Sequence, residues 1–263
     1  MKLISSRENA LFKHAKALSH SSRERRKAGM ALLEGVHLVS AFMALHGMPK
    51  TLVVSESAQA RGEIAPLLAR AMAADLVVLA DALFQEVSTF ETPSGILALI
   101  TPPQPHAVPD DALACLLLED IQDPGNVGAI LRSAAASGVR HVLLSTGCAF
   151  AWSPKVLRAG QGAHFLLNIV EGADLEAFLR GFSGQSLALT PRAGQTIYDI
   201  DMKRSIALLI GNEGAGLSAQ LLQAADQQVA IPMPGQTESI NAAAAASVCL
   251  FEMVRQRRTT NEG

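Results

Sequence analysis

The stretch LLLEDIQDPGNVGAILRSAAASGV, residues 116–139, joins an apolar run of the buried-strand type to a helical pattern with almost no loop between them. Asp123 can accept hydrogen bonds from the first amides of that helix, and Pro124 suits its first position. A strand that passes directly into a helix is the unit from which parallel α/β sheets are built. The stretch therefore predicts an α/β fold and guides the interpretation of the segments around it.

One face of the predicted helix combines very small residues with a single cation. Its members are Gly125, Gly128, Ala129 and Arg132. Small residues allow another backbone or a ligand to approach closely, and the guanidinium supplies a fixed positive charge. Tight packing of the helix on a sheet, with Arg132 in a surface ion pair, explains the same face equally well.

The alternation of apolar runs and helical patterns continues through the C-terminal part of the chain. Strands are expected at 113–118, 141–145, 166–170, 186–190, 205–210 and 228–231. Continuous apolar strands separated by helices are typical of a parallel sheet that is covered on both faces. We therefore predict that this part folds as one parallel α/β domain.

A smaller set of alternating elements precedes it and predicts a small α/β domain. A basic helix is expected over about 9–28, further helices at 36–45, 64–73 and 81–87, and strands at 31–33, 51–54, 76–79 and 96–100. Between the two sets, TPPQPHAVPDDA at 101–112 has four prolines and no glycine, which indicates an extended linker. We divide the chain into a domain at 1–101, a linker at 102–111 and a domain at 112–263.

The composition excludes several classes of protein. The chain has 263 residues, 49% of them hydrophobic, and a mean hydropathy of +0.24, which excludes a disordered or fibrous chain. The charged start MKLISSRENALFKHAK does not resemble a signal peptide, and no apolar stretch reaches the ~18 residues of a membrane span. Three cysteines without CxxC spacing fit a reducing compartment, so we expect a cytoplasmic protein. The histidines lack zinc-site spacing, and no metal is expected.

Charge is distributed unevenly along the chain. Residues 1–30 hold eight Lys and Arg against two Glu, a balance of +6, which leaves −8 for the rest of a chain of net charge −2. A basic N-terminus on an acidic body is typical of proteins that bring a polyanion to a separate site. The candidate phosphate-binding cations are Arg23, Arg25, Arg26 and Lys27. A solvated helix face is the alternative explanation.

A second glycine-rich segment, IALLIGNEGAGLS at 206–218, has the pattern of a strand, a flexible loop and a helix. Gly211, Gly214 and Gly216 leave the backbone free to bend at the carboxyl edge of the sheet, where open α/β sheets bind ligands. The spacing matches neither the dinucleotide fingerprint nor the phosphate-binding loop. Glu213 would repel a phosphate, so a cationic or neutral ligand is favoured.

A third segment, 229–258, leaves the sheet through Pro232 and Pro234, which cannot donate backbone hydrogen bonds. Ser239 is expected to cap the long helix that follows, with Asn241 in its first turn. The alanine run at 242–246 predicts close packing. Residues 158–164, RAGQGAH, are interpreted as a turn.

The order and spacing of three segments are more specific than any one of the segments alone. DPGNVGAILRSA from Asp123, LIGNEGAGL from Leu209 and IPMPGQTESIN from Ile231 resemble the three signature motifs of the SpoU (TrmH) family of RNA ribose 2'-O-methyltransferases. The resemblance covers about 112–258. The N-terminal segments SREN and LLEGVH are similar to the ribosomal-protein-like substrate-binding domain that many members carry.

The resemblance implies a SPOUT-type domain whose C-terminal chain forms a deep trefoil knot and binds S-adenosylmethionine. It also implies a homodimer with the active site near the interface. By motif, the catalytic set is Asn126, Arg132, Glu213, Ser239 and Asn241, and the cofactor contacts are Thr190, Gly211, Asn212, Ile231 and Ile240. Ile-Asn-Ala-Ala at 240–243 stands where many members have Leu-Asn-Val-Ser, a small apolar change that we expect to be tolerated.

Methyl transfer to a hydroxyl needs in-line placement and loss of the hydroxyl proton, without a metal. In this family the arginine of the first motif is thought to assist deprotonation. A guanidinium is a poor base at neutral pH, so we interpret Arg132 as a clamp on the neighbouring phosphate, oriented by Ser239 and Glu213. Ribosomal RNA is the expected substrate and transfer RNA the alternative.

Two other classes of function compete with the methyltransferase. A non-catalytic RNA-binding protein of the same fold would not need the complete catalytic set. An NAD-dependent oxidoreductase would need the G-x-G-x-x-G fingerprint, which the chain lacks.

Overall fold

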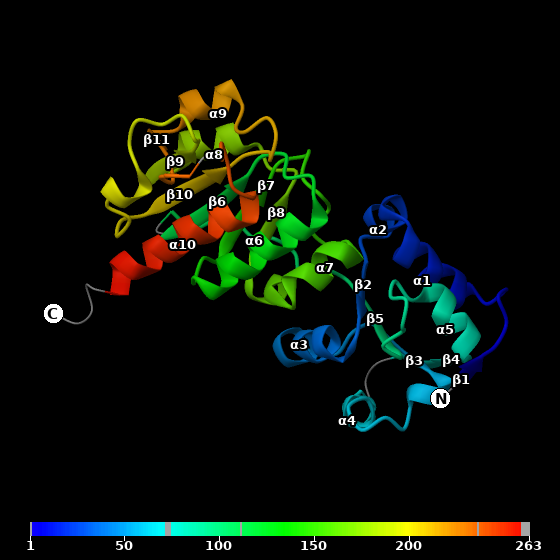
Figure 1. Cartoon of the computed structure of the whole chain (residues 1–263). Coiled ribbons are helices and arrows are strands. Elements are labelled where there is room, and N and C mark those ends of the chain that lie inside the picture. Colours follow the sequence, from blue (N-terminus) through cyan, green and yellow to red (C-terminus); the bar gives the residue numbers. More distant parts are fainter. Residues whose placement is uncertain (1, 72–74, 111, 236, 259–263) are drawn as a thin grey trace. The chain divides into compact units, whose positions relative to one another are not determined.

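The computed structural model describes residues 2–71, 75–110, 112–235 and 237–258. The chain forms two compact units. The first comprises 1–104 together with 152–165, and the second comprises 105–151 together with 166–263 (Figure 1). A stretch from the middle of the chain thus packs with the N-terminal unit.

The first unit is built on a mixed sheet of order β1-β4-β3-β5-β2. Its strands are β1 (Lys2–Ile4), β2 (Ala31–Glu34), β3 (Thr51–Ser55), β4 (Asp75–Leu79) and β5 (Ile96–Ile100). β1 and β3 run parallel to β4, whereas β5 is antiparallel to both β3 and β2. The sequence predicted four of these strands. β1 was missed because three residues are too few to show a periodic pattern.

The helices of the first unit largely follow the predicted pattern. They are α1 (Ala10–His20), α2 (Ser22–Ala28), α3 (Val36–His46), α4 (Ala65–Arg70) and α5 (Asp81–Val87), with a short 3-10 helix, η1 (Glu56–Ala58). The helix predicted over 64–73 ends at Arg70, and 72–74 lie outside the described residues.

The single basic helix predicted over 9–28 is wrong, because the chain breaks at Ser21. This residue is extended, and its N–H donates to the Ala17 carbonyl at the end of α1. Its hydroxyl accepts a hydrogen bond from the Glu24 amide and so caps α2. Serine competes with helical hydrogen bonding in this way and favours N-cap positions over helix interiors.

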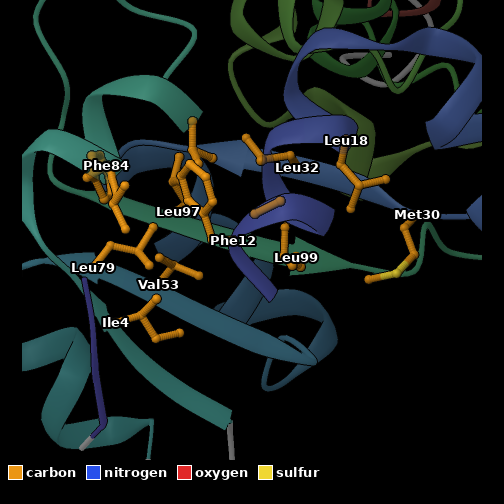
Figure 2. Close-up of a cluster of buried hydrophobic side chains, with 13 residues drawn as sticks. Ile4, Phe12, Leu18, Met30, Leu32, Val53, Leu79, Phe84, Leu97 and Leu99 are labelled. Carbon is orange, nitrogen blue, oxygen red and sulfur yellow. The ribbon is translucent and has the colours of Figure 1, made fainter. Parts of the chain in front are cut away.

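Helices α1 and α5 bury their apolar sides against one face of this sheet. Figure 2 shows Phe12 and Leu18 of α1 beside Leu32 and Leu97 of the sheet. Phe84 of α5 joins the same cluster and is 1% exposed. The N-terminal unit therefore has a hydrophobic core of its own.

Segment 152–165 contributes α7 (Pro154–Gly160) and most of the 3-10 helix η2 (Ala163–Leu166). α7 packs beside β2, and the Phe165 ring meets the Phe42 ring of α3 edge to face at 5.4 Å between centroids. The turn predicted over 158–164 is therefore wrong in part. Helix α7 continues to Gly160, and the chain turns only at Gln161 and Gly162, which both have positive φ.

The second unit is built on the parallel sheet that the sequence predicted, with order β11-β9-β10-β6-β7-β8. The strands are β6 (Ala114–Leu118), β7 (His141–Leu144), β8 (Asn168–Glu171), β9 (Gln185–Leu189), β10 (Ile206–Ile210) and β11 (Gln227–Val229). β6 and β10 are neighbours and end in register, with Leu118 opposite Ile210. The loops after these two central strands therefore emerge side by side.

Helices cover both faces of this sheet (Figure 1). They are α6 (Pro124–Ala136), α8 (Leu175–Gly181), α9 (Ala219–Ala224) and α10 (Ala242–Arg258), with a 3-10 helix, η3 (Ile197–Asp199). Leu179 of α8 and Leu221 of α9 pack on Leu209 of the sheet. On the other side α6 and α10 pack together, and the Ser133 and Ser247 hydroxyls are 2.8 Å apart.

The described part of the predicted linker, 102–110, contains no helix or strand, and its last residue, Asp111, lies outside the described residues. The linker is anchored at His106, whose N–H donates to Asn168 Oδ1 at 3.0 Å. Asn168 Nδ2 in turn donates to the His106 carbonyl at 2.9 Å. No helix among the described residues is long and apolar enough to cross a membrane.

Candidate active site

The loop after β10, residues 211–216, is closed by one side chain. Asn212 Oδ1 accepts hydrogen bonds from the amides of Gly214 and Ala215, both at 2.9 Å. Its Nδ2 donates to the Asp120 carbonyl at 2.8 Å. The backbones of Asn212 and Gly216 also exchange two hydrogen bonds, so the loop's own groups define its shape.

Gly211 is required by the loop itself. A Cβ atom at this position would lie 2.3 Å from the Gly216 carbonyl carbon and 2.4 Å from the Leu217 nitrogen. Backbone atoms cannot move aside to relieve such a clash, as the end of a flexible side chain can. The absence of a side chain at Gly211 is therefore required by the loop's own backbone.

The three sequence motifs meet in a line of hydrogen bonds. Asn241 Nδ2 donates to Asn126 Oδ1 at 2.8 Å, and Asn126 Nδ2 donates to Glu213 Oε1 at 2.7 Å. Asn126 is held at the start of α6 because its amide donates to the capping carboxylate of Asp123. Residues that are 115 and 87 positions apart in the chain are thus brought into direct contact.

The predicted cap of the C-terminal helix is corrected by two residues. α10 begins at Ala242, and Asn241, not Ser239, caps it. Asn241 Oδ1 accepts from the amides of Ala243 and Ala244 at 2.9 and 3.2 Å. Both serine and asparagine are good caps, so composition alone does not choose between them.

A cavity of about 850 Å³ opens beside this loop. The five predicted cofactor contacts line it, and so do two members of the predicted catalytic set: Thr190, Gly211, Asn212, Ile231, Ile240, Glu213 and Ser239. Its volume lies within the range of small-molecule sites, about 300 to 1,000 Å³. The sequence did not assign Arg192, Met233 and Glu238 to the lining. Arg192 lies outside the three motifs, whereas Met233 and Glu238 stand within the third, which was the available signal.

Arg132 does not belong to this cavity. It lies on α6 with its side chain exposed, and it makes no ion pair or hydrogen bond with any described residue. The predicted surface ion pair is therefore not formed within the described chain. Within one chain Glu213 accepts a hydrogen bond from Asn126, and no bond joins Glu213 or Ser239 to Arg132 among the described residues. The expectation that these two residues orient Arg132 stays a prediction.

Two acidic residues at the end of β6 support the site and were not assigned by the sequence. Glu119 Oε2 accepts from the Ser218 amide at 2.7 Å, at the start of α9. Asp120 has a positive φ of 54° and offers its carbonyl to Asn212. Their position directly after a buried strand is the sequence signal that could have assigned them to the site.

The basic N-terminal residues separate into two kinds. Arg23, Arg26 and Lys27 are exposed on α2. Arg25 is only 6% exposed, and its Nη1 donates to the carbonyls of Leu18 and Ser19 at the end of α1. The prediction of Arg25 as an exposed phosphate contact is therefore wrong, because its charge holds two helices together.

The three cysteines of the chain are buried in the second unit. Burial raises the pKa of the Cys115 thiol to about 12 and that of Cys249 to about 12. Both are buried free thiols of unit two, as is Cys148. Within the described residues, no group of three or more His, Cys, Asp or Glu side chains is arranged to hold a metal ion.

Comparison with known proteins finds a family match for each of the two parts of the chain. Residues 114–251 match the SpoU rRNA Methylase family, and residues 9–98 match the MRM3-like substrate binding domain. An uncharacterized tRNA/rRNA methyltransferase of Synechocystis is 37% identical over 97% of this chain and 94% of its own length. The 23S rRNA (guanosine(2553)-2'-O)-methyltransferase RlmP of Bacillus subtilis is 32% identical over 96% of this chain and 99% of its own length.

Solved structures agree over nearly the whole chain. The SpoU methyltransferase AviRb of Streptomyces viridochromogenes, in complex with AdoMet, is 30% identical, with a TM-score of 0.86 over 96% of this chain and 99% of that one. The AdoMet-bound rRNA methyltransferase of Sinorhizobium meliloti is 27% identical, with a TM-score of 0.84 over 97% of each chain. Because both the motifs and the full-length relatives agree, this chain belongs to the SpoU rRNA methylase family.

Proposed function

We propose that this protein transfers a methyl group from S-adenosylmethionine to a ribose 2'-hydroxyl of RNA, and that the RNA is ribosomal. The observation that carries the proposal is the meeting of Asn126, Glu213 and Asn241 at the edge of one cavity. Transfer RNA is the alternative substrate, since the Synechocystis relative is named as a tRNA/rRNA methyltransferase and RlmP as a 23S rRNA enzyme.

The lining of the cavity supports a cationic cofactor as its ligand. Its lining combines apolar side chains such as Ile231 and Ile240 with the exposed backbone of the loop at 211–216. Glu213 places a carboxylate on the wall, which favours a positive charge over a phosphate. When bound there, S-adenosylmethionine supplies an activated methyl group on a sulfonium.

The protein's own residues then position the acceptor. Asn212 fixes the shape of loop 211–216, which forms one wall of the proposed cofactor site. Arg132, which carries an exposed guanidinium, is assigned to the phosphate next to the reacting ribose, where a planar fork binds two oxygens at once. Ser239 lines the cavity and offers a hydroxyl to the substrate side.

RNA capture is assigned to the first unit. Its exposed cations on α2, Arg23, Arg26 and Lys27, supply phosphate contacts. The match of 9–98 to a substrate binding domain supports this division of roles.

The protein is proposed to act as a homodimer through the face formed by α6 and α10. Phe251 of α10 is 49% exposed, and Arg132 of the adjoining helix lies outside the cavity of its own chain. An interface on this face covers the aromatic ring and brings each Arg132 toward the partner's cavity. Light scattering of the wild type and of Phe251→Glu tests the dimer, with a monomeric variant expected.

Two further expectations belong to the same proposal. The C-terminal chain is proposed to form the trefoil knot, which is supported by its return from β11 at the sheet edge to Asn126 on α6. The protein is proposed to be cytoplasmic, in keeping with its free thiols and with the ribosomal substrate. An experimental chain trace and cell fractionation test these points.

Transfer of labelled methyl from S-adenosylmethionine to total RNA, followed by mapping of the modified ribose, tests the activity. We expect label in large-subunit ribosomal RNA. Titration calorimetry with S-adenosylmethionine and with NAD separates the methyltransferase from an oxidoreductase. Cofactor binding without transfer to any RNA would favour the non-catalytic RNA-binding protein.

A further inference from the structure

The proton acceptor of the proposed reaction can be sought among the charged side chains that line the cavity. Among the described residues they are Arg192, Glu213 and Glu238. Methylation of a hydroxyl requires a group that takes up its proton, and a guanidinium is charged at any working pH and cannot accept one. The choice lies between the two carboxylates.

The hydrogen bonds around Glu213 have only one possible direction. Asn241 Oδ1 is occupied by the two amides at the start of α10, so its Nδ2 is the group that faces Asn126. Asn126 must then accept with Oδ1 and donate with Nδ2, and the receiving atom is Glu213 Oε1. The cap of a helix thus decides the orientation of two amides and one carboxylate.

The carboxylates of Glu213 and Glu238 differ in their hydrogen bonds. Glu213 has Oε1 fixed by a charge-assisted hydrogen bond of 2.7 Å, while Oε2 has no donor among the described residues. Glu238 makes no hydrogen bond or ion pair with any residue in the described ranges, and its residue is exposed. A fixed acceptor atom is what in-line transfer requires, because misplacement by about 1 Å can cost about 100-fold in rate.

We propose that Glu213 accepts the proton of the ribose 2'-hydroxyl, and that Asn126 and Asn241 are positioning residues that hold its carboxylate in place. This inference rests on the proposed function. In the step the 2'-oxygen bonds to the methyl carbon, and the carbon–sulfur bond breaks with its electron pair remaining on sulfur. The hydroxyl proton passes to Glu213 Oε2, so the positive sulfonium and the negative carboxylate both become neutral.

The first test is Glu213→Gln, which keeps an oxygen that can accept from Asn126 and removes the basic group. We expect the single-turnover rate with saturating cofactor and RNA to fall at least about 100-fold. The dissociation constant for S-adenosylmethionine, from calorimetry, should stay near that of the wild type. Glu176→Gln on α8, an exposed carboxylate far along the chain from the motifs, is the matched control and should keep full activity.

Three results would overturn the assignment. Glu213→Gln that transfers methyl at the wild-type rate excludes Glu213 as proton acceptor. A rate that falls only in step with cofactor affinity shows that the carboxylate merely attracts the sulfonium. Loss of the rate in Glu238→Gln with retention in Glu213→Gln moves the role to Glu238.

The positioning role is tested with Asn241→Asp and Asn126→Asp. An ionised Asp at 241 still accepts from the amides of α10, so the thermal midpoint should not change, but it cannot donate to Asn126. We expect a rate loss of roughly 10- to 100-fold with unchanged KM for both substrates. A wild-type rate in Asn241→Asp, or a loss that appears only in KM, would overturn the positioning role.

A readout independent of turnover uses the side-chain amide signals of Asn126 and Asn241 in a ¹H–¹⁵N NMR spectrum of the free protein. We expect the Asn126 signal to be shifted in the wild type, to move in Glu213→Gln and to approach that of an exposed Asn in Asn241→Asp. Signals that do not respond contradict the relay. Failure of the proposed function is distinguishable, because it appears as absence of methyl transfer by the wild-type protein.

Discussion

The cavity loop of the second unit and the basic helix α2 of the first satisfy their polar groups in opposite ways. Asn212 uses its side-chain oxygen and nitrogen entirely within the protein, as Asn126 and Asn241 do. Arg23 and Lys27 are exposed to solvent instead. In a site whose side chains hydrogen-bond to one another, the loss of one atom changes the position of several groups, so a single substitution has a large effect. On a charged surface each cation contributes a small, separate part of the RNA affinity.

The largest effect is expected at the point where the loop is tightest. Gly211→Val places a branched side chain on the backbone of Gly216 and Leu217, so the loop cannot close. We expect calorimetry to detect no S-adenosylmethionine binding by a folded protein. Gly194→Val is the control, because a Cβ atom there meets nothing within 4 Å. Tight cofactor binding by Gly211→Val would show that the loop does not form the site.

Arg132→Ala should abolish turnover while cofactor affinity is retained, since Arg132 lies outside the cavity. We expect a reduction of at least about 100-fold in kcat, and a similar reduction for Arg132→Lys, whose point charge cannot replace a planar fork. A parallel decrease in cofactor binding would contradict this division of roles.

Mixing of subunits tests whether Arg132 acts in the cavity of its own chain or in that of the partner. If Arg132 serves the partner's cavity, a mixture of Arg132→Ala and Gly211→Val proteins should regain activity that neither has alone. The restored site would combine an intact loop from one chain with an intact arginine from the other. A mixture as inactive as its components would place both groups in one chain's site.

Within the basic region, Arg25→Ala should lower the free energy of unfolding by about 1.5 to 3 kcal/mol, the range for hydrogen bonds to a charged group. The decrease arises because the carbonyls of Leu18 and Ser19 no longer have their donor. Arg23→Ala, on the exposed side of α2, is the matched control and should leave stability unchanged. Urea denaturation of both variants measures the difference, and equal stabilities would refute the structural role of Arg25.

The smallest effects per residue are expected from the exposed cations. Replacement of Arg23, Arg26 and Lys27 by Gln should reduce the log-log dependence of RNA affinity on salt by about 0.7 to 0.9 for each phosphate that is no longer neutralised. The affinity for cofactor should not change. Lys203→Gln, an exposed cation of the other unit, controls for net charge. An unchanged salt slope in the triple variant would assign RNA capture elsewhere, for example to Arg258 at the end of α10.

Much of the fold could be predicted because its signals are local. The apolar runs of β6 and β10 and the Asp123-Pro124 helix start each depend on a few neighbouring residues. The order of strands in the sheet depends on pairings such as Leu118 with Ile210, which no local pattern encodes. The motifs named Asn126, Glu213 and Asn241, which the structure brings together, but they did not predict the hydrogen bonds between these residues.

The errors have a common physical origin, since they concern residues with two plausible partners. Arg25 can face solvent or the carbonyls that end α1, and the break at Ser21 decides in favour of the carbonyls. Ser239 and Asn241 can each cap a helix, and the bond from Asn241 to Asn126 favours Asn241. Tertiary contacts decide these cases.

The placement of 152–165 in the N-terminal unit bears on how the protein can be divided for expression. A fragment that stops at Gln104 omits Phe165 and leaves the ring of Phe42 and the imidazole of His46 without the cover that they have in the whole chain. A fragment that starts at Pro105 carries α7 without the strand β2 on which it packs. The boundaries of the matched families, 9–98 and 114–251, are therefore not the boundaries at which this chain can be cut. A fusion that joins 1–104 directly to 152–165 through a short linker is the fragment that preserves the packing of the first unit.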